Sequence, residues 1–106
     1  MFMQSTIDVA SDQTAAFNEL MAEIVAHQAT HGWRLVAAFV QITGDLGTYV
    51  DVWEMDDAAH FERGLAALRS HPDFARFRKV LSSAVRHETV VLGLPAPYSA
   101  GPRAAR

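Results

Sequence analysis

The hydrophobic and polar positions of this chain change their spacing several times, and each change predicts a different element. From Phe2 to Val9 apolar and polar residues alternate loosely, as is typical of a strand. From Thr14 to about Thr30 one helical stripe carries the apolar residues Phe17, Leu20, Met21, Ile24 and Val25. Gly32 is expected to end this helix.

The next segment predicts a β-hairpin. Residues 35–42 are almost continuously apolar, which is typical of a strand buried on both faces, and residues 49–55 are its expected partner across a turn bounded by Gly44 and Gly47. If Thr43 lies opposite Thr48, the pairs that follow are Ile42 with Tyr49, Val40 with Asp51, and Ala38 with Trp53. One face would then carry Val36, Ala38, Val40, Ile42, Tyr49, Asp51, Trp53 and Met55, and the other Leu35, Ala37, Phe39, Gln41, Val50, Val52 and Glu54.

The C-terminal half predicts two short helices and a last strand. Asp56 and Asp57 are suitable cap and first-turn residues for a helix whose apolar positions are Phe61, Leu65 and Leu68. Pro72 is expected to break that helix, since proline is tolerated in a first turn but not in an interior. A second helix follows through Phe74, Phe77 and Leu81, and residues 85–94 are rich in β-branched residues, as expected of a strand.

This order predicts an α+β fold of the ferredoxin-like type, βαββαβ, with helices on one side of an antiparallel sheet. We expect residues 1–98 to form one such domain and residues 99–106 a flexible tail. The free face of the sheet would expose a large apolar patch. Pairing of two sheets into a homodimer, a dimeric α+β barrel, would cover it.

Composition narrows the possible functions. The 106 residues include no cysteine, which excludes disulfides, thiolate metal sites and cysteine nucleophiles. The pI near 5.9 argues against nucleic-acid binding. No segment approaches the roughly 18 apolar residues of a membrane span, so we expect a cytoplasmic protein without membrane contact. The glycines of the hairpin do not open a helix, so phosphate-loop and dinucleotide chemistry is not expected.

Histidines at i and i+4 suggest a metal site, but their positions argue against one. His27 and His31 follow Glu23 by one and two helical turns. These side chains fall at the flank of the apolar stripe or beyond it, and no fourth ligand is evident. We therefore expect no metal and no cofactor.

Asp51 is the first candidate for chemistry. It stands in the middle of a predicted strand between Tyr49 and Trp53. A carboxylate there is costly unless it is hydrogen-bonded, so it is either satisfied structurally or positioned for proton transfer. An apolar wall would favour its neutral form, as in many acid and base catalysts.

Other candidates surround it. Tyr49 and Trp53 could stack on a ligand, or could simply pack in the core or at a dimer interface. His87 could be a second catalytic group acting as a general base, or an ordinary exposed residue near the start of the last strand. Phe39 and Gln41 are further candidate ligand contacts on the neighbouring strand.

Several motifs together resemble the NIPSNAP family. They are His31-Gly32-Trp33-Arg34-Leu35-Val36, Thr43-Gly44-Asp45-Leu46-Gly47, Val52-Trp53, Arg63-Gly64-Leu65-Ala66-Ala67-Leu68, His71-Pro72-Asp73-Phe74-Ala75-Arg76-Phe77 and Leu94-Pro95-Ala96-Pro97-Tyr98-Ser99. The resemblance covers roughly residues 32–99. It departs from the family at Gly47, where Asn is common, and at Asp51, where His is common.

The resemblance implies a homodimer of ferredoxin-like subunits with a cavity between sheet and helices. In related barrels such cavities serve cofactor-free oxygenation, cyclisation or isomerisation of small organic molecules. Two hypotheses follow: a small cofactor-independent enzyme (monooxygenase, cyclase or isomerase type) that uses Asp51 or His87, or a non-catalytic homodimer that binds a ligand or a protein partner. Fold analogy alone does not decide between them.

Overall fold

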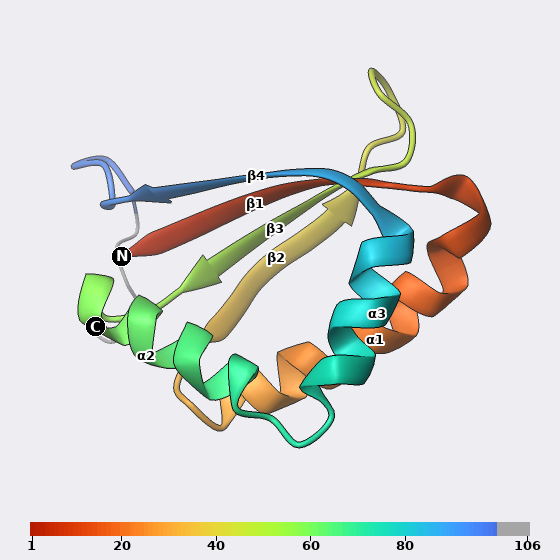
Figure 1. Ribbon diagram of the computed structural model, residues 1–106. Coiled ribbons are helices and arrows are strands. Elements are labelled where there is room, and N and C mark those ends of the chain that lie inside the picture. Colours follow the sequence, from red (N-terminus) through yellow and green to blue (C-terminus); the bar gives the residue numbers. More distant parts are fainter. Residues whose placement is uncertain (100–106) are drawn as a thin grey trace.

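The computed structural model describes residues 1–99, which form a four-stranded antiparallel sheet with its helices packed on one face (Figure 1). The strands are β1 (Phe2–Val9), β2 (Arg34–Val40), β3 (Thr48–Glu54) and β4 (Val85–Gly93), and the helices are the 3-10 turn η1 (Ser11–Gln13), α1 (Thr14–Ala29), α2 (Ala58–Arg69) and α3 (Phe74–Ala84). The order across the sheet is β2-β3-β1-β4. The predicted ferredoxin-like α+β fold is confirmed. Most of the tail predicted over residues 99–106 lies outside the described residues.

The predicted periodicities account for the elements. Every second residue of β1 is buried, namely Met3, Ser5, Ile7 and Val9, and these side chains face the helices. On α1 the buried positions are Phe17, Leu20, Ile24 and Gln28, one helical stripe. Asp57 caps α2, because its carboxylate accepts a hydrogen bond from His60 N–H at 2.8 Å. None of the helices in residues 1–99 is long and apolar enough to cross a bilayer.

The predicted hairpin register was wrong by two residues. Gln41, rather than Thr43, closes the loop, and its backbone N–H donates to Thr48 O at 2.9 Å. Val40 therefore lies opposite Tyr49 and Ala38 opposite Asp51. Because side chains alternate with a period of two, a slip of two residues leaves them on the predicted faces.

A β-bulge corrects the face assignment near the start of β2. The register shifts between Leu35 and Ala37, so that Leu35 lies opposite Trp53 and packs against the core on the helix side. The sequence pattern had assigned Leu35 to the opposite face, together with Ala37. A one-residue irregularity of this kind leaves no mark in the apolar pattern.

The prediction that the second strand is buried on both faces is also wrong for the single chain. β2 is an edge strand, and Phe39 is 53% exposed. The other edge strand, β4, exposes Val90, Val91 and Leu92. In the loop that projects beyond the sheet, Ile42 and Leu46 are exposed as well (Figure 1). Apolar surface therefore lies along both edges of the sheet.

Candidate functional site

A cavity of about 320 Å³ lies between the inner face of the sheet and the helices. Its wall is mostly apolar, with Met3, Ile7 and Val90 from the sheet and Phe17, Met21, Ile24, Leu65, Leu68 and Leu81 from the helices. The aromatic side chains of Trp33, Trp53 and Phe61 line it too. A mostly apolar hollow with a few polar groups is the usual form of a small-molecule site.

Asp51 lies in this wall. Its side chain belongs to the central strand β3, next to Ser5 of β1, and the residue is only 5% exposed. Within residues 1–99 no hydrogen bond to its carboxylate is formed. Burial and, to a smaller extent, the nearby Glu88 carboxylate together raise the pKa of Asp51 to about 6. The sequence left open whether Asp51 is hydrogen-bonded structurally or positioned for proton transfer. The hydrogen-bonded arrangement is not observed among residues 1–99.

Glu88 and Ser5 form a second polar pair in the same wall. Ser5 Oγ donates to Glu88 Oε2 at 2.6 Å, across the β1–β4 pairing. Both residues line the cavity. The strands thus place two carboxylates and one hydroxyl on a single face, and only one of the carboxylates has a hydrogen-bond donor within the described chain.

Gln28 adds a buried amide from α1. The side chain is 1% exposed, and its Nε2 donates to Gly64 O at 3.1 Å. Its Oε1 has no hydrogen-bond partner among residues 1–99, although it is buried. Since buried polar atoms are nearly always paired, this oxygen marks a place where a bound molecule or a water would donate a hydrogen bond.

Sequence reasoning missed Ser5, Gln28 and Glu88, although two of them carried a signal. Ser5 interrupts the apolar positions of β1 between Met3 and Ile7. Gln28 likewise falls on the apolar stripe of α1, one turn after Ile24. A polar residue on a buried face is the same signal that drew attention to Asp51. Glu88 had no such signal, because β4 is an exposed edge strand.

Three of the four predicted ligand contacts divide between two hollows. Trp53 lines the cavity described above, and its ring packs edge-on to Trp33 with centroids 5.6 Å apart. Tyr49 and Phe39 line a second hollow of about 310 Å³ at the β2 edge. The Tyr49 hydroxyl accepts a hydrogen bond from Asn18 Nδ2 at 3.1 Å. Asp51 lines both hollows.

His87 and Gln41 lie elsewhere. His87 is opposite Asp8 in the β1–β4 pairing, on the sheet face that no helix covers. With Gln41 it lines a third hollow of about 600 Å³ beside the hairpin loop. The structure does not bring His87 and Asp51 together, so the two cannot act on one ligand in one cavity.

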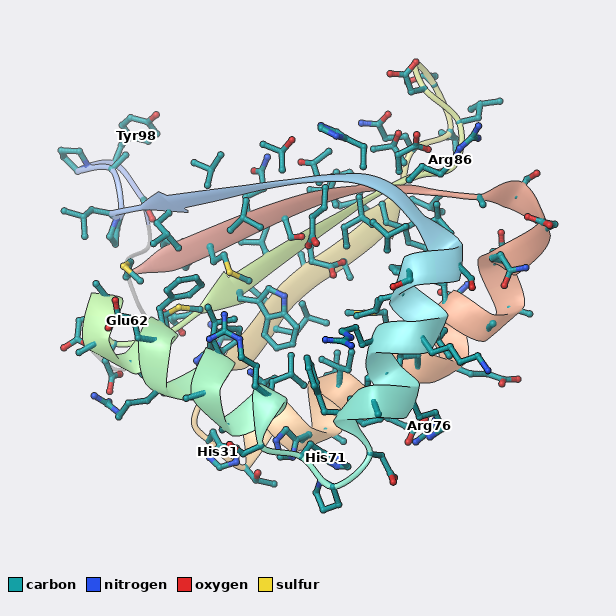
Figure 2. All side chains as sticks on the ribbon, in the orientation of Figure 1. His31, Glu62, His71, Arg76, Arg86 and Tyr98 are labelled. Carbon is teal, nitrogen blue, oxygen red and sulfur yellow. The ribbon has the colours of Figure 1, made fainter. Side chains whose placement is uncertain are left out.

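The other histidines have structural contacts. The ring of His27 packs edge-on against His31 and His71, with centroids 4.9 and 4.7 Å apart. His71 Nδ1 accepts a hydrogen bond from Asp73 N–H at 2.9 Å. Both His31 and His71 lie below the helices, away from the sheet (Figure 2). Among the described residues no group of three or more His, Cys, Asp or Glu side chains is arranged to hold a metal ion.

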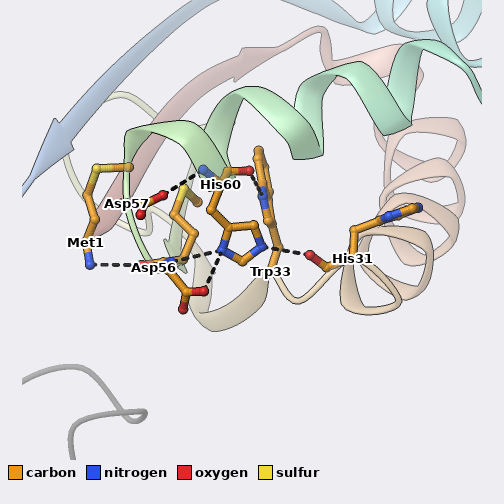
Figure 3. A network of polar contacts seen from close by, with 7 residues as sticks. Met1, His31, Trp33, Asp56, Asp57 and His60 are labelled. Atoms are coloured by element: carbon orange, nitrogen blue, oxygen red, sulfur yellow. Dashed lines mark hydrogen bonds and ion pairs between the residues drawn. The ribbon is translucent and has the colours of Figure 1, made fainter.

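His60 is the centre of a separate buried network (Figure 3). Its Nδ1 accepts from Asp56 N–H at 2.9 Å, and its Nε2 lies 2.7 Å from His31 O. Its carbonyl oxygen accepts from Trp33 Nε1 at 3.3 Å. Both ring nitrogens are thus satisfied, so the ring holds the β3–α2 connection to the end of α1.

Fold and site together define a ferredoxin-like α+β protein with an interior cavity under its sheet. The family model described as NIPSNAP matches residues 6–100, so this chain belongs to the NIPSNAP family. The resemblance inferred from the motifs is confirmed.

Solved structures share the fold of this chain. A NIPSNAP family protein from Agrobacterium tumefaciens has a TM-score of 0.82 at 18% identity, covering 93% of this chain and 95% of that one. An uncharacterized NIPSNAP domain protein from Burkholderia xenovorans has a TM-score of 0.75 at 21% identity, covering 92% and 97%. A structure described as an antibiotic biosynthesis monooxygenase has a TM-score of 0.69 at 20% identity, covering 91% and 98%. The curated proteins yielded no match.

Proposed function

We propose that this chain binds a small, partly apolar organic molecule in the cavity under its sheet, and that Asp51 acts on it as a general base. The observation that carries the proposal is the Asp51 carboxylate itself, which is buried in a mostly apolar wall and receives no hydrogen bond from any described residue. A buried charge without a partner is destabilising, and such groups cluster at functional sites.

The proposed chemistry is proton transfer that needs no cofactor. A carboxylate whose pKa is raised to about 6 is a stronger base than an ordinary aspartate, yet is still mostly ionised at neutral pH. Asp51 would take a proton from the ligand and leave the electron pair on the ligand. This is a first step shared by isomerisation and cyclisation. One of the similar structures is described as a monooxygenase, which supports an enzymatic role by analogy of fold only.

A homodimer is part of the proposal. Exposed apolar side chains line both sheet edges and the hairpin loop, including Phe39, Ile42, Leu46, Val91 and Leu94. A second copy of the chain over the helix-free face would bury several of them. Light scattering tests this directly, and Phe39→Glu with Val91→Glu should shift a dimer towards monomer. A wild-type chain that is monomeric at micromolar concentration would contradict it.

A cytoplasmic location belongs to the same proposal. Fractionation of cells that express the full-length protein would test it, and recovery with the membrane or the secreted fraction would contradict it.

Deuterium exchange tests the catalytic role. The ketone 2-tetralone is a bicyclic carbon acid of a size suited to the cavity, and its exchange in D₂O can be followed by proton NMR. We expect the chain to accelerate exchange, Asp51→Asn to abolish the acceleration, and Asp8→Asn to retain it, because Asp8 lies on the other sheet face.

Three outcomes separate the possibilities. Equal exchange by wild type and Asp51→Asn would show that Asp51 is not the base. Binding of 2-tetralone without accelerated exchange would favour the non-catalytic alternative, a homodimer that holds a ligand or a protein partner. Absence of both binding and exchange would count against the proposal as a whole for this class of ligand.

A further inference from the structure

The polar side chains of the cavity wall are mostly hydrogen-bond acceptors. The polar side chains lining it are Ser5, Gln28, Asp51 and Glu88. The Ser5 hydroxyl already donates to Glu88, and the Gln28 amide nitrogen already donates to Gly64 O. The oxygens left to accept hydrogen bonds are those of the carboxylates and one amide oxygen, and the indole N–H of Trp53, which also lines the cavity, is a donor. A ligand that satisfies these oxygens must donate hydrogen bonds to them.

The charge of the wall has one sign. Two carboxylates line the cavity, and no Lys, Arg or His side chain of the described chain does so. An anionic ligand would meet two negative charges and lose its own hydration without compensation. A cation would be attracted electrostatically by the Asp51 and Glu88 carboxylates, which would repel an anion.

The apolar part of the wall also suits a cation with an organic body. Three aromatic rings gather there, with Trp33 stacked on Phe61 at 5.8 Å between centroids and edge-on to Trp53 at 5.6 Å. Aromatic faces attract ammonium groups in sites from which water is excluded. The volume of about 320 Å³ accommodates a molecule of one or two fused rings.

We infer that the ligand of this cavity is an organic ammonium, an apolar body carrying a protonated amine that donates hydrogen bonds to Asp51. This rests on the proposed function, because it specifies the chemical class of the molecule bound in the same cavity. Glu88 and Gln28 Oε1 supply further acceptors in the same wall. A metal ion is a poorer fit, because the described side chains offer no set of metal ligands.

Three probes of one shape test the inference: 2-aminotetralin, 2-tetralol and tetralin-2-carboxylate, which are cationic, neutral and anionic at pH 7.5. Their affinities are measured by titration calorimetry on the full chain. We expect the amine to bind about tenfold or more tightly than the alcohol, and the carboxylate to bind most weakly, as expected of a charge-assisted hydrogen bond in a buried site.

Two variants test whether the preference for the amine depends on Asp51. Asp51→Asn should reduce the preference for the amine over the alcohol to about threefold or less, with the affinity for the alcohol little changed. Asp8→Asn is the matched control, since it removes a carboxylate from the opposite face of the same sheet and should leave the preference intact.

The failures of the two proposals are distinguishable. If none of the three probes binds, the cavity is not a site for molecules of this size, and the proposed function fails together with the inference. If the alcohol or the carboxylate binds as tightly as the amine, the ammonium inference fails while the cavity remains a binding site. A preference for the amine that Asp51→Asn leaves unchanged also overturns the inference.

Discussion

Two groups of polar side chains are buried in this molecule, and they differ in how completely they are satisfied. Around His60 each ring nitrogen has a partner, and the cap of α2 and the Trp33 indole join the same network (Figure 3). In the cavity wall neither the Asp51 carboxylate nor Gln28 Oε1 has a hydrogen-bond donor within the part of the chain that the structure describes. The first group stabilises the fold, whereas the second retains hydrogen-bond acceptors that a ligand can satisfy.

Burial of a polar residue therefore does not by itself mark a functional site. His60 and Asp51 are almost equally buried, at 6% and 5% exposed. His60 is nonetheless a structural residue, because its partners are backbone groups of the neighbouring segments. Asp51 faces a hollow instead. Four substitutions test this contrast, and they follow in descending order of their expected effect on stability.

Gly64→Ala should cause the largest loss of stability, because it displaces the Trp33 indole, which belongs to both the His60 network and the cavity wall. A Cβ on Gly64 would overlap the indole of Trp33, which lines the cavity and donates to His60 O. We expect a loss of about 3 kcal/mol in the free energy of unfolding, although Gly to Ala within a helix ordinarily stabilises by about 1 kcal/mol. Chemical denaturation measures it. Gly93→Ala, with open space at the new Cβ, should be nearly neutral, and equal effects of the two substitutions would contradict this account.

His60→Ala should destabilise the satisfied region by ~2 to 3 kcal/mol. It leaves Asp56 N–H and His31 O without their ring partner and opens a small cavity. The control is His31→Ala, which keeps the backbone oxygen that His60 uses and removes only an exposed ring. We expect the control to cost less than 1 kcal/mol. Urea denaturation of both variants provides the comparison, and a His60→Ala chain as stable as the control would show that the network is not structural.

Asp51→Asn should stabilise the chain by ~1 to 2 kcal/mol at pH 8. The pKa of Asp51 is raised from 3.8 to about 6, so the folded chain binds this proton more tightly than the unfolded chain, and stability falls as the pH rises from about 4 to about 6. Each pKa unit corresponds to ~1.4 kcal/mol, and solvent entering the cavity reduces the effect.

The pH dependence of thermal unfolding is the measurement for Asp51. The difference between wild type and Asp51→Asn should vanish below about pH 4, where both are neutral, and be complete above about pH 7. Asp8→Asn serves as the control and should show no such rise. A variant less stable than wild type at pH 8 would mean that the carboxylate has a favourable partner in solution.

Ser5→Ala should have the smallest effect, a loss of ~0.5 to 1 kcal/mol. It removes the hydrogen bond from Ser5 to Glu88. Because this hydrogen bond is only partly buried, water can donate to Glu88 in its place. Ser82→Ala removes an exposed hydroxyl that bonds within α3 and should be neutral or slightly stabilising. Thermal unfolding of the two variants provides the comparison. A loss above about 2 kcal/mol for Ser5→Ala would show that Ser5 stabilises the fold as the His60 network does.

The kind, order and approximate limits of the helices and strands could be predicted from the sequence. Alternation in residues 2–9 and the stripe that begins at Phe17 are local properties, because the pleat of a strand and the turn of a helix repeat within a few residues. The same patterns predicted the ferredoxin-like fold and drew attention to Asp51. The same patterns place two polar residues, Ser5 and Gln28, at positions expected to be buried, and this could have indicated that they belong to the site.

The surroundings of Asp51 could not be predicted in this way, because they depend on contacts between distant parts of the chain. The two-residue slip of the hairpin, the bulge after Leu35 and the edge position of β2 depend on how strands from distant parts of the chain pair. Cross-strand pairing likewise placed Glu88 on the cavity face and its neighbour His87 on the other. Periodicity specifies which side of an element is apolar, but only packing between elements decides which polar groups meet and which remain without a partner.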